Sequence, residues 1–186
     1  AQMIVGDGAE ARSIAYRVLP ARDAGAGRPG IVWLGGFKSD MKGTKAVAIE
    51  EFAARSGRAY LRFDYSGHGE SGGSFEDGTI SRWLEESLAV IRAHTSGPQI
   101  LVGSSMGGAL SLHWATRRRG GFSRVVCVNS PGLVPFKPPP LFALAFDHLF
   151  RRAGEEVGIG ELAVHARDIG VGLGEFFLQA RALGDD

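Results

Sequence analysis

A glycine-flanked serine stands between an apolar strand and a helix at residues 100–115, and this junction limits the possible folds more than any other segment. Residues 100–102 are Ile-Leu-Val, a short apolar run. The run leads directly into Gly-Ser-Ser-Met-Gly, a G-x-S-x-G pattern from Gly103 to Gly107, and a stretch of small residues follows. Between a strand and a helix, this pattern places its central serine on a sharp and strained turn. The segment therefore predicts a strand–turn–helix unit with Ser105 at the turn.

Such a turn gives the serine a chemical environment as well as a position. The turn needs glycine at positions 103 and 107, because a side chain at either would collide with the neighbouring strand and helix. The serine would lie at the start of a helix, where backbone amides and the helix dipole favour developing negative charge. We therefore expect Ser105 to be a nucleophile and the Met106 amide to be one donor to an oxyanion.

Predicted strands and helices alternate along most of the chain. Apolar runs and alternating patterns predict strands at 13–19, 31–34, 59–65, 99–103 and 124–129. Apolar positions at helical spacing predict helices at 44–56, 80–91 and 106–115. The alternation from residue 31 to residue 129 is typical of an α/β protein, with a mostly parallel sheet and flanking helices.

Composition excludes several other classes of protein. The chain has 186 residues, a length typical of one domain, and its formal net charge is +1. This balance gives no electrostatic case for a nucleic-acid partner. No run of about 18 apolar residues is present, so we expect no membrane span. The single cysteine, Cys127, lies in an apolar run and is expected to be a buried thiol, and no metal-ligand spacing is present.

Two loops after predicted strands carry further signals. Gly35 and Gly36 follow the strand at 31–34, and glycines there let the backbone approach a ligand closely. We assign the second oxyanion amide to Phe37, with Gly36 as the alternative. The other loop, residues 64–71, has the sequence Asp-Tyr-Ser-Gly-His-Gly-Glu-Ser. We expect Asp64, Gly67 and Gly69 to shape this loop, and His68 to be structural rather than catalytic.

These three segments, in this order, resemble the α/β-hydrolase superfamily. Residues 36–46 and 63–75 further resemble the branch that includes palmitoyl-protein thioesterase and acyl-glucuronide esterase. The resemblance is firm over residues 28–116. It implies a serine hydrolase that needs no cofactor and acts on a small-molecule carboxylic ester or thioester. In this superfamily, an acid and then a histidine follow the serine along the chain.

The chain departs from this pattern after residue 130. Residues 131–140 contain five prolines, and the segments 141–152 and 161–183 suggest helices. We therefore expect a hydrolase-like core at 1–130 that lacks the last strands of the superfamily. Residues 131–186 would form a Pro-rich connection and a helical tail.

The tail does not determine which residue is the catalytic base. Asp147 and His165 have the superfamily's order after Ser105, and they are the candidate acid and base. Three explanations of the tail remain: a truncated enzyme, a slipped reading frame, or a genuine helical tail. A sheet that stops near residue 129 would expose an edge strand, which suggests a homodimer or a tail that covers the edge.

Two functions follow from the sequence. The first is a serine hydrolase that forms an acyl-enzyme on Ser105. The alternative is a non-catalytic or truncated hydrolase-fold scaffold. In either case we expect no metal, no nucleic-acid partner and a cytoplasmic location.

Overall fold

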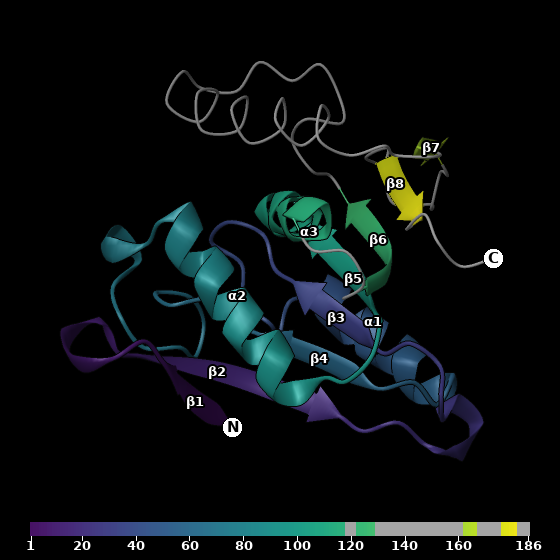
Figure 1. The fold of residues 1–186 in the computed structure, drawn as a ribbon, viewed down its shortest axis with the longest axis horizontal. Coiled ribbons are helices and arrows are strands. Elements are labelled where there is room, and N and C mark those ends of the chain that lie inside the picture. The colour runs from purple at the N-terminus through teal and green to yellow at the C-terminus, as the bar shows by residue number, and fades with distance from the viewer. Residues whose placement is uncertain (118–121, 129–161, 167–175, 182–186) are drawn as a thin grey trace.

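The protein is built around one sheet flanked by helices. The computed structural model describes residues 1–117, 122–128, 162–166 and 176–181 (Figure 1). Along the sheet the strand order is β1-β2-β4-β3-β5-β6-β8-β7. The strands are β1 (Gln2–Val5), β2 (Arg12–Leu19), β3 (Ile31–Leu34), β4 (Tyr60–Phe63), β5 (Gln99–Ser104), β6 (Phe122–Val128), β7 (Leu162–Ala166) and β8 (Phe176–Arg181).

The centre of the sheet is parallel. β4, β3, β5 and β6 pair side by side in parallel, and helices connect them. The helices are α1 (Thr44–Arg55), α2 (Ile80–His94) and α3 (Met106–Arg117). β1 and β2 are antiparallel additions on one side, and β8 and β7 are antiparallel additions on the other. This arrangement brings the carboxyl ends of β3, β4 and β5 to one edge of the sheet.

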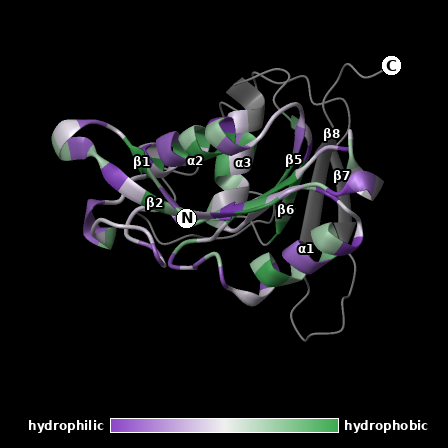
Figure 2. Cartoon of the chain, turned by 90° about the horizontal axis from the view of Figure 1, so that it is seen from below, coloured by the Kyte–Doolittle hydropathy of each residue, from purple (hydrophilic) through white to green (hydrophobic). Residues whose placement is uncertain are grey.

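Different helices cover the two faces of the sheet. Helices α2 and α3 cover one face and α1 covers the other (Figures 1 and 2). Each face has its own cluster of buried apolar side chains. Because successive side chains in a strand point to opposite faces, β3 contributes residues to both clusters. Val32 and Leu34 pack in the larger cluster with α2 and α3, whereas Ile31 and Trp33 pack against α1. A strand buried on both faces requires a continuous apolar run, and all four residues of β3 are buried.

The structure confirms the predicted fold class. The five strands and three helices predicted up to residue 129 are all present, and their ends shift by a few residues at most. Cys127 is buried, as expected. Strand β1 is the element that the sequence prediction missed. It is four residues long, and only its last residue, Val5, is buried, so its apolar pattern is weak.

The prediction of helices at 161–183 is wrong in part. Within that range the structure has β7 and β8, which pair with each other antiparallel. β8 also pairs with β6 from Arg124 to Val128. β6 would otherwise present unpaired N–H and C=O groups, and this pairing satisfies them. Therefore β6 is not the edge strand that the sequence suggested.

Other predictions for the tail concern residues that the structure does not describe. The Pro-rich segment, the helix expected at 141–152 and the proposed boundary at residue 130 all lie outside the described residues. Among the helices that are described, none is long and apolar enough to cross a membrane.

Candidate active site

Ser105 lies between the carboxyl end of β5 and the first residue of α3, in a backbone conformation that side chains rarely adopt. Its φ is +51°, in the left-handed region. Its N–H donates to the carbonyl oxygen of Val128 at 2.9 Å. Its own carbonyl accepts from Gly108 N at 3.1 Å and from Ala109 N at 3.3 Å. Contacts from both β6 and α3 thus hold the strained turn in place.

The glycines on either side of this turn allow α3 to start close to the sheet. A Cβ on Gly103 would collide with the backbone of Gly107 and Gly108. A Cβ on Gly107 would collide with the carbonyl oxygen of Leu34 in β3. Close packing of three backbones at this point excludes any larger residue.

The loop after β3 lies directly against Ser105. A Cβ on Gly36 would be 3.4 Å from the Cβ of Ser105 and 3.3 Å from the carbonyl oxygen of Ser104. The next residue, Phe37, is 38% exposed. Its ring makes edge contacts with Phe75 at 5.0 Å and with Trp83 at 6.1 Å between centroids. The two segments expected to supply oxyanion amides are therefore neighbours in space.

Hydrogen bonds fix the conformation of this glycine loop. The carbonyl oxygen of Gly36 accepts from the Ser39 N–H at 3.2 Å and from Ser39 Oγ at 2.7 Å. The Tyr65 hydroxyl donates to the carbonyl oxygen of Gly35 at 3.2 Å. Burial raises the pKa of Tyr65, which keeps this phenol protonated as a donor.

Asp64 organises the neighbouring loop after β4. Its carboxylate is buried and accepts from Met41 N at 2.6 Å and from Glu70 N at 2.9 Å. Burial raises its pKa, and the two backbone hydrogen bonds oppose that rise. A Cβ on Gly69 (φ +49°) would collide with this carboxylate, and a Cβ on Gly67 (φ +71°) would collide with the backbone of Phe75. The Asp64 carboxylate thus accepts from backbone N–H groups in two loops, Met41 after β3 and Glu70 after β4.

His68 lies in the same loop and is 5% exposed. Its Nε2 accepts from the Lys38 N–H at 3.2 Å, and its Nδ1 donates to the carbonyl oxygen of Ser66 at 3.1 Å. Backbone groups thus occupy both ring nitrogens. These contacts favour the structural interpretation of His68 over a catalytic one.

The described residues do not bring the predicted acid and base to Ser105. Asp147 lies outside them. His165 lies in β7, where its backbone is in register with Phe177 of β8. Two strands, β8 and β6, separate β7 from β5 in the sheet. In the described part of the chain no histidine or carboxylate is hydrogen-bonded to the Ser105 hydroxyl, and no three potential metal ligands are grouped.

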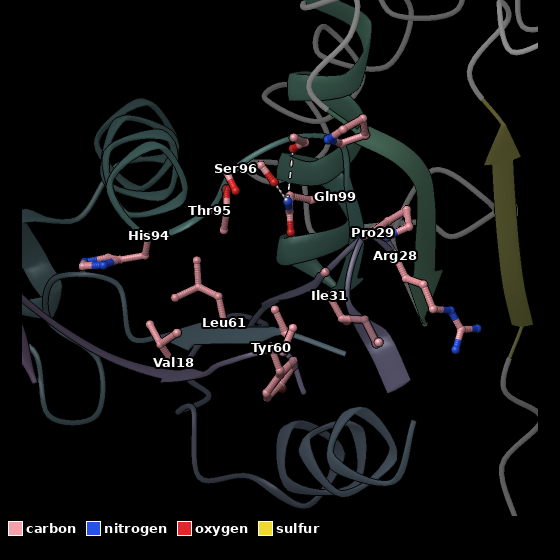
Figure 3. Close-up of a pocket in the computed structure, with 17 residues that line it drawn as sticks. Val18, Arg28, Pro29, Ile31, Tyr60, Leu61, His94, Thr95, Ser96 and Gln99 are labelled. Atoms are coloured by element: carbon pink, nitrogen blue, oxygen red, sulfur yellow. Dashed lines mark hydrogen bonds between the residues drawn. The ribbon is translucent and has the colours of Figure 1, made fainter. Parts of the chain in front are cut away.

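A cavity of about 540 Å³ lies at the opposite edge of the sheet, beside the amino ends of β3 and β5 (Figure 3). Two of the polar side chains that line it, Gln99 and Thr95, bond to nearby backbone. Gln99 Nε2 donates to the carbonyl oxygens of Ser96 at 2.7 Å and Gly97 at 3.1 Å, and Thr95 Oγ1 donates to that of Ile91 at 2.8 Å. Gln99 begins β5, whereas Ser105 follows its last residue. The cavity is therefore separate from the serine turn.

Comparison with known proteins gives the same fold family that the strand order and the serine turn indicate. A family model described as "alpha/beta hydrolase fold" matches residues 35–166. The human and bovine proteins named palmitoyl-protein thioesterase ABHD10, mitochondrial, are each 47% identical over 106 residues. That match covers 57% of this chain and 33% of each relative. The chain thus spans about a third of the length of these curated relatives.

Solved structures that resemble this chain are also named as hydrolases. A presumed hydrolase from Agrobacterium vitis is 35% identical, with a TM-score of 0.63, and the match covers 96% of this chain and 67% of that one. Mouse alpha/beta hydrolase domain-containing protein 10 is 41% identical, with a TM-score of 0.55. That match covers 63% of this chain and 45% of the mouse chain.

Proposed function

This chain belongs to the α/β-hydrolase fold family, and from that premise we propose that it is a serine hydrolase that cleaves carboxylic ester or thioester bonds. The observation that carries the proposal is the strained Ser105 turn, packed against the Gly36 loop at the carboxyl edge of the sheet. Holding a non-glycine residue in the left-handed region costs roughly 1–3 kcal/mol, and such strain clusters at functional sites. The flanking glycines serve the same geometry.

The proposed reaction has two steps. The Ser105 Oγ attacks the acyl carbon, its proton passes to a base, and the alcohol or thiol leaves with a proton returned to it. Water then attacks the acyl-enzyme, which releases the carboxylic acid and restores the Ser105 hydroxyl. Asp147 and His165 remain the proposed acid and base, in the chain order typical of the family.

The oxyanion is proposed to bind between two backbone amides. Met106 is the first residue of α3, so its N–H lies at the positive end of the helix dipole. Phe37 follows Gly36, the residue that lies against Ser105. Two such donors, aimed at the position where charge develops, would each contribute about 3 kcal/mol to lowering the barrier.

The substrate class follows from the surroundings and from the relatives. Phe37, Phe75 and Trp83 form an aromatic cluster beside the serine turn, with Phe37 partly exposed. Aromatic surface of this kind suits the apolar part of an acyl group. The related mammalian proteins are named as palmitoyl-protein thioesterases, and an acyl thioester is accordingly the proposed substrate.

A fluorophosphonate probe tests the proposal, because such probes label activated serines. We expect labelling of the folded wild type and its loss in Ser105→Ala. Ser104→Ala is the matched control, since Ser104 is the neighbouring serine of the same motif and ends β5. It should keep its labelling. Ser105→Ala should also reduce hydrolysis of a p-nitrophenyl ester or an acyl thioester by about 10³-fold or more.

The outcome distinguishes the two functions that the sequence suggests. A folded wild type that is not labelled, or a Ser105→Ala variant that still turns over, would contradict the proposed reaction. The former result would favour a non-catalytic or truncated scaffold.

A homodimer and a cytoplasmic location remain predictions. The mammalian relatives carry "mitochondrial" in their names, so the compartment needs its own measurement. Light scattering coupled to size-exclusion chromatography would test the dimer, and cell fractionation would test the location. A monomeric mass across micromolar concentrations would contradict the homodimer. Recovery of the protein with organelles would contradict the cytoplasmic location.

A further inference from the structure

We infer that His68 is a positioning residue of the proposed reaction: its ring fixes the loop whose Phe37 amide is assigned to the oxyanion. This inference rests on the proposed function. The loops after β3 and β4 meet at the carboxyl edge because these strands are neighbours in the sheet (Figure 1). The hydrogen bond from the Lys38 N–H to His68 Nε2, at 3.2 Å, joins the two loops.

The hydrogen bonds define the tautomer of the ring. An N–H donor faces Nε2, so this nitrogen carries no proton. The proton is then on Nδ1, which donates to the carbonyl oxygen of Ser66 at 3.1 Å. A neutral imidazole with this tautomer is thus used as an acceptor on one side and as a donor on the other.

The ring is held on all sides. It makes edge contacts with the rings of Tyr65, Phe75 and Trp83, at centroid distances of 5.6, 5.2 and 5.1 Å. Trp83 Nε1 donates to the same Ser66 carbonyl oxygen at 3.1 Å. The acceptor that orients Nδ1 is therefore itself anchored to α2.

The consequence for Phe37 follows from the planarity of peptide bonds. Its preceding peptide is fixed because the Gly36 carbonyl oxygen accepts two hydrogen bonds from Ser39. In a trans peptide the N–H points away from that carbonyl, so the direction of the Phe37 N–H is set. Its following peptide is fixed by the bond from Lys38 to His68. Both planes that flank Phe37 are thus held, and Lys38 is kept at a φ of +55°.

Loss of the acceptor should affect the transition state more than the bound substrate. An oxyanion donor that is out of position stabilises the developing charge poorly, while apolar contacts still bind the acyl group. A purely structural residue would instead lower stability and leave kcat per folded molecule unchanged.

The test compares His68→Leu, which removes the acceptor, with His68→Gln, whose Oε1 can accept near the position of Nε2. We expect kcat on a p-nitrophenyl ester to fall about tenfold or more in His68→Leu, with KM within about twofold. His68→Gln should recover most of that loss. His113→Gln is the matched control for replacing a buried histidine, since His113 lies in α3 and is 8% exposed. Circular dichroism checks that each variant is folded.

A measurement on the wild type gives a second test that needs no variant. The ¹⁵N chemical shift of His68 Nε2 should be that of an unprotonated ring nitrogen. A proton on Nε2 would overturn the inference, as would an unchanged kcat in a folded His68→Leu or an equal loss in the Leu and Gln variants. Absence of both turnover and Ser105 labelling in the wild type would instead overturn the proposed function, and this role with it.

Discussion

Ser105 and Lys38 are the two described non-glycine residues with positive φ, and they lie on the turn after β5 and the loop after β3, which are neighbours at the carboxyl edge. The strain of each is offset by hydrogen bonds from elsewhere in the fold. Val128 accepts the Ser105 N–H, and His68 accepts the Lys38 N–H. The chain thus maintains two unfavourable backbone conformations next to each other, where the proposed reaction needs fixed amide groups.

The strain at Ser105 predicts different stabilities for two substitutions that both remove the hydroxyl. Ser105→Gly should have a free energy of unfolding about 1 kcal/mol higher than Ser105→Ala, because glycine adopts a positive φ without steric cost. Urea unfolding of the two variants measures the difference. A glycine variant less stable than the alanine variant would show that the turn is not left-handed.

Asp64 predicts a pH dependence of stability. Burial raises its pKa above the ordinary value of 3.8, so the folded state binds the proton more tightly than the unfolded state. Its contribution to stability is therefore fully present below pH 3.8 and is lost as the pH rises through the folded-state pKa. The difference in unfolding free energy between wild type and Asp64→Asn should grow in favour of the wild type as the pH falls from 7 toward 4. Denaturant unfolding at each pH tests this, and a difference that shrinks over the range would contradict it.

At the level of elements, one buried ion pair connects β2, α2 and the loop after β4. Arg12 Nε lies 2.7 Å from Glu86 Oε1, with exposed fractions of 7% and 0%. The other carboxylate oxygen of Glu86 accepts from the Ser66 N–H at 2.9 Å. The Ser66 carbonyl oxygen also accepts from His68 and Trp83. The Arg12–Glu86 pair therefore holds the start of the loop that supports the candidate site.

Removal of one partner should therefore be costly. Arg12→Met leaves the Glu86 carboxylate buried without its cation, and should lower the free energy of unfolding by about 3–5 kcal/mol. Arg55→Met is the matched control, because Arg55 pairs with Glu51 on the exposed surface of α1 at 3.9 Å. It should cost less than about 1 kcal/mol. Equal effects of the two substitutions in urea unfolding would contradict the buried role of Arg12.

At the scale of the whole molecule, the sheet separates two regions of different character. The carboxyl edge carries the strained turn, the glycine loop and the aromatic cluster. The amino edge carries the cavity of about 540 Å³, where the side chains of Gln99 and Thr95 donate to nearby backbone carbonyl oxygens. The length of β5, about 16 Å at 3.3 Å per residue, lies between them.

This separation predicts that the two edges act independently. Ser96→Trp places a large ring at the cavity, which Ser96 lines as an exposed residue. The rate of fluorophosphonate labelling at Ser105 should stay within about twofold of the wild type, since no loop at the carboxyl edge is displaced. A tenfold change in labelling rate, with the fold intact, would show that the two edges are coupled.

Local sequence determined the strand–turn–helix unit at Ser105, the two-faced strand β3 and the helices that flank the sheet. These features depend on neighbouring residues: on glycines at fixed offsets and on apolar residues at the spacing of a strand or a helix. For the same reason, the positions of Ser105, Gly36 and Asp64 at the carboxyl edge followed once the parallel order was inferred.

Tertiary structure alone decided what depends on partners distant in the chain. Strand pairing outweighed the helical pattern at 162–166 and 176–181, because β8 pairs with the backbone of β6. The role of His68 depends on an amide 30 residues away, and the Arg12–Glu86 pair joins residues 74 apart. Sequence periodicity reports which face of an element is apolar, but a hydrogen bond between two loops exists only after the sheet has brought those loops together.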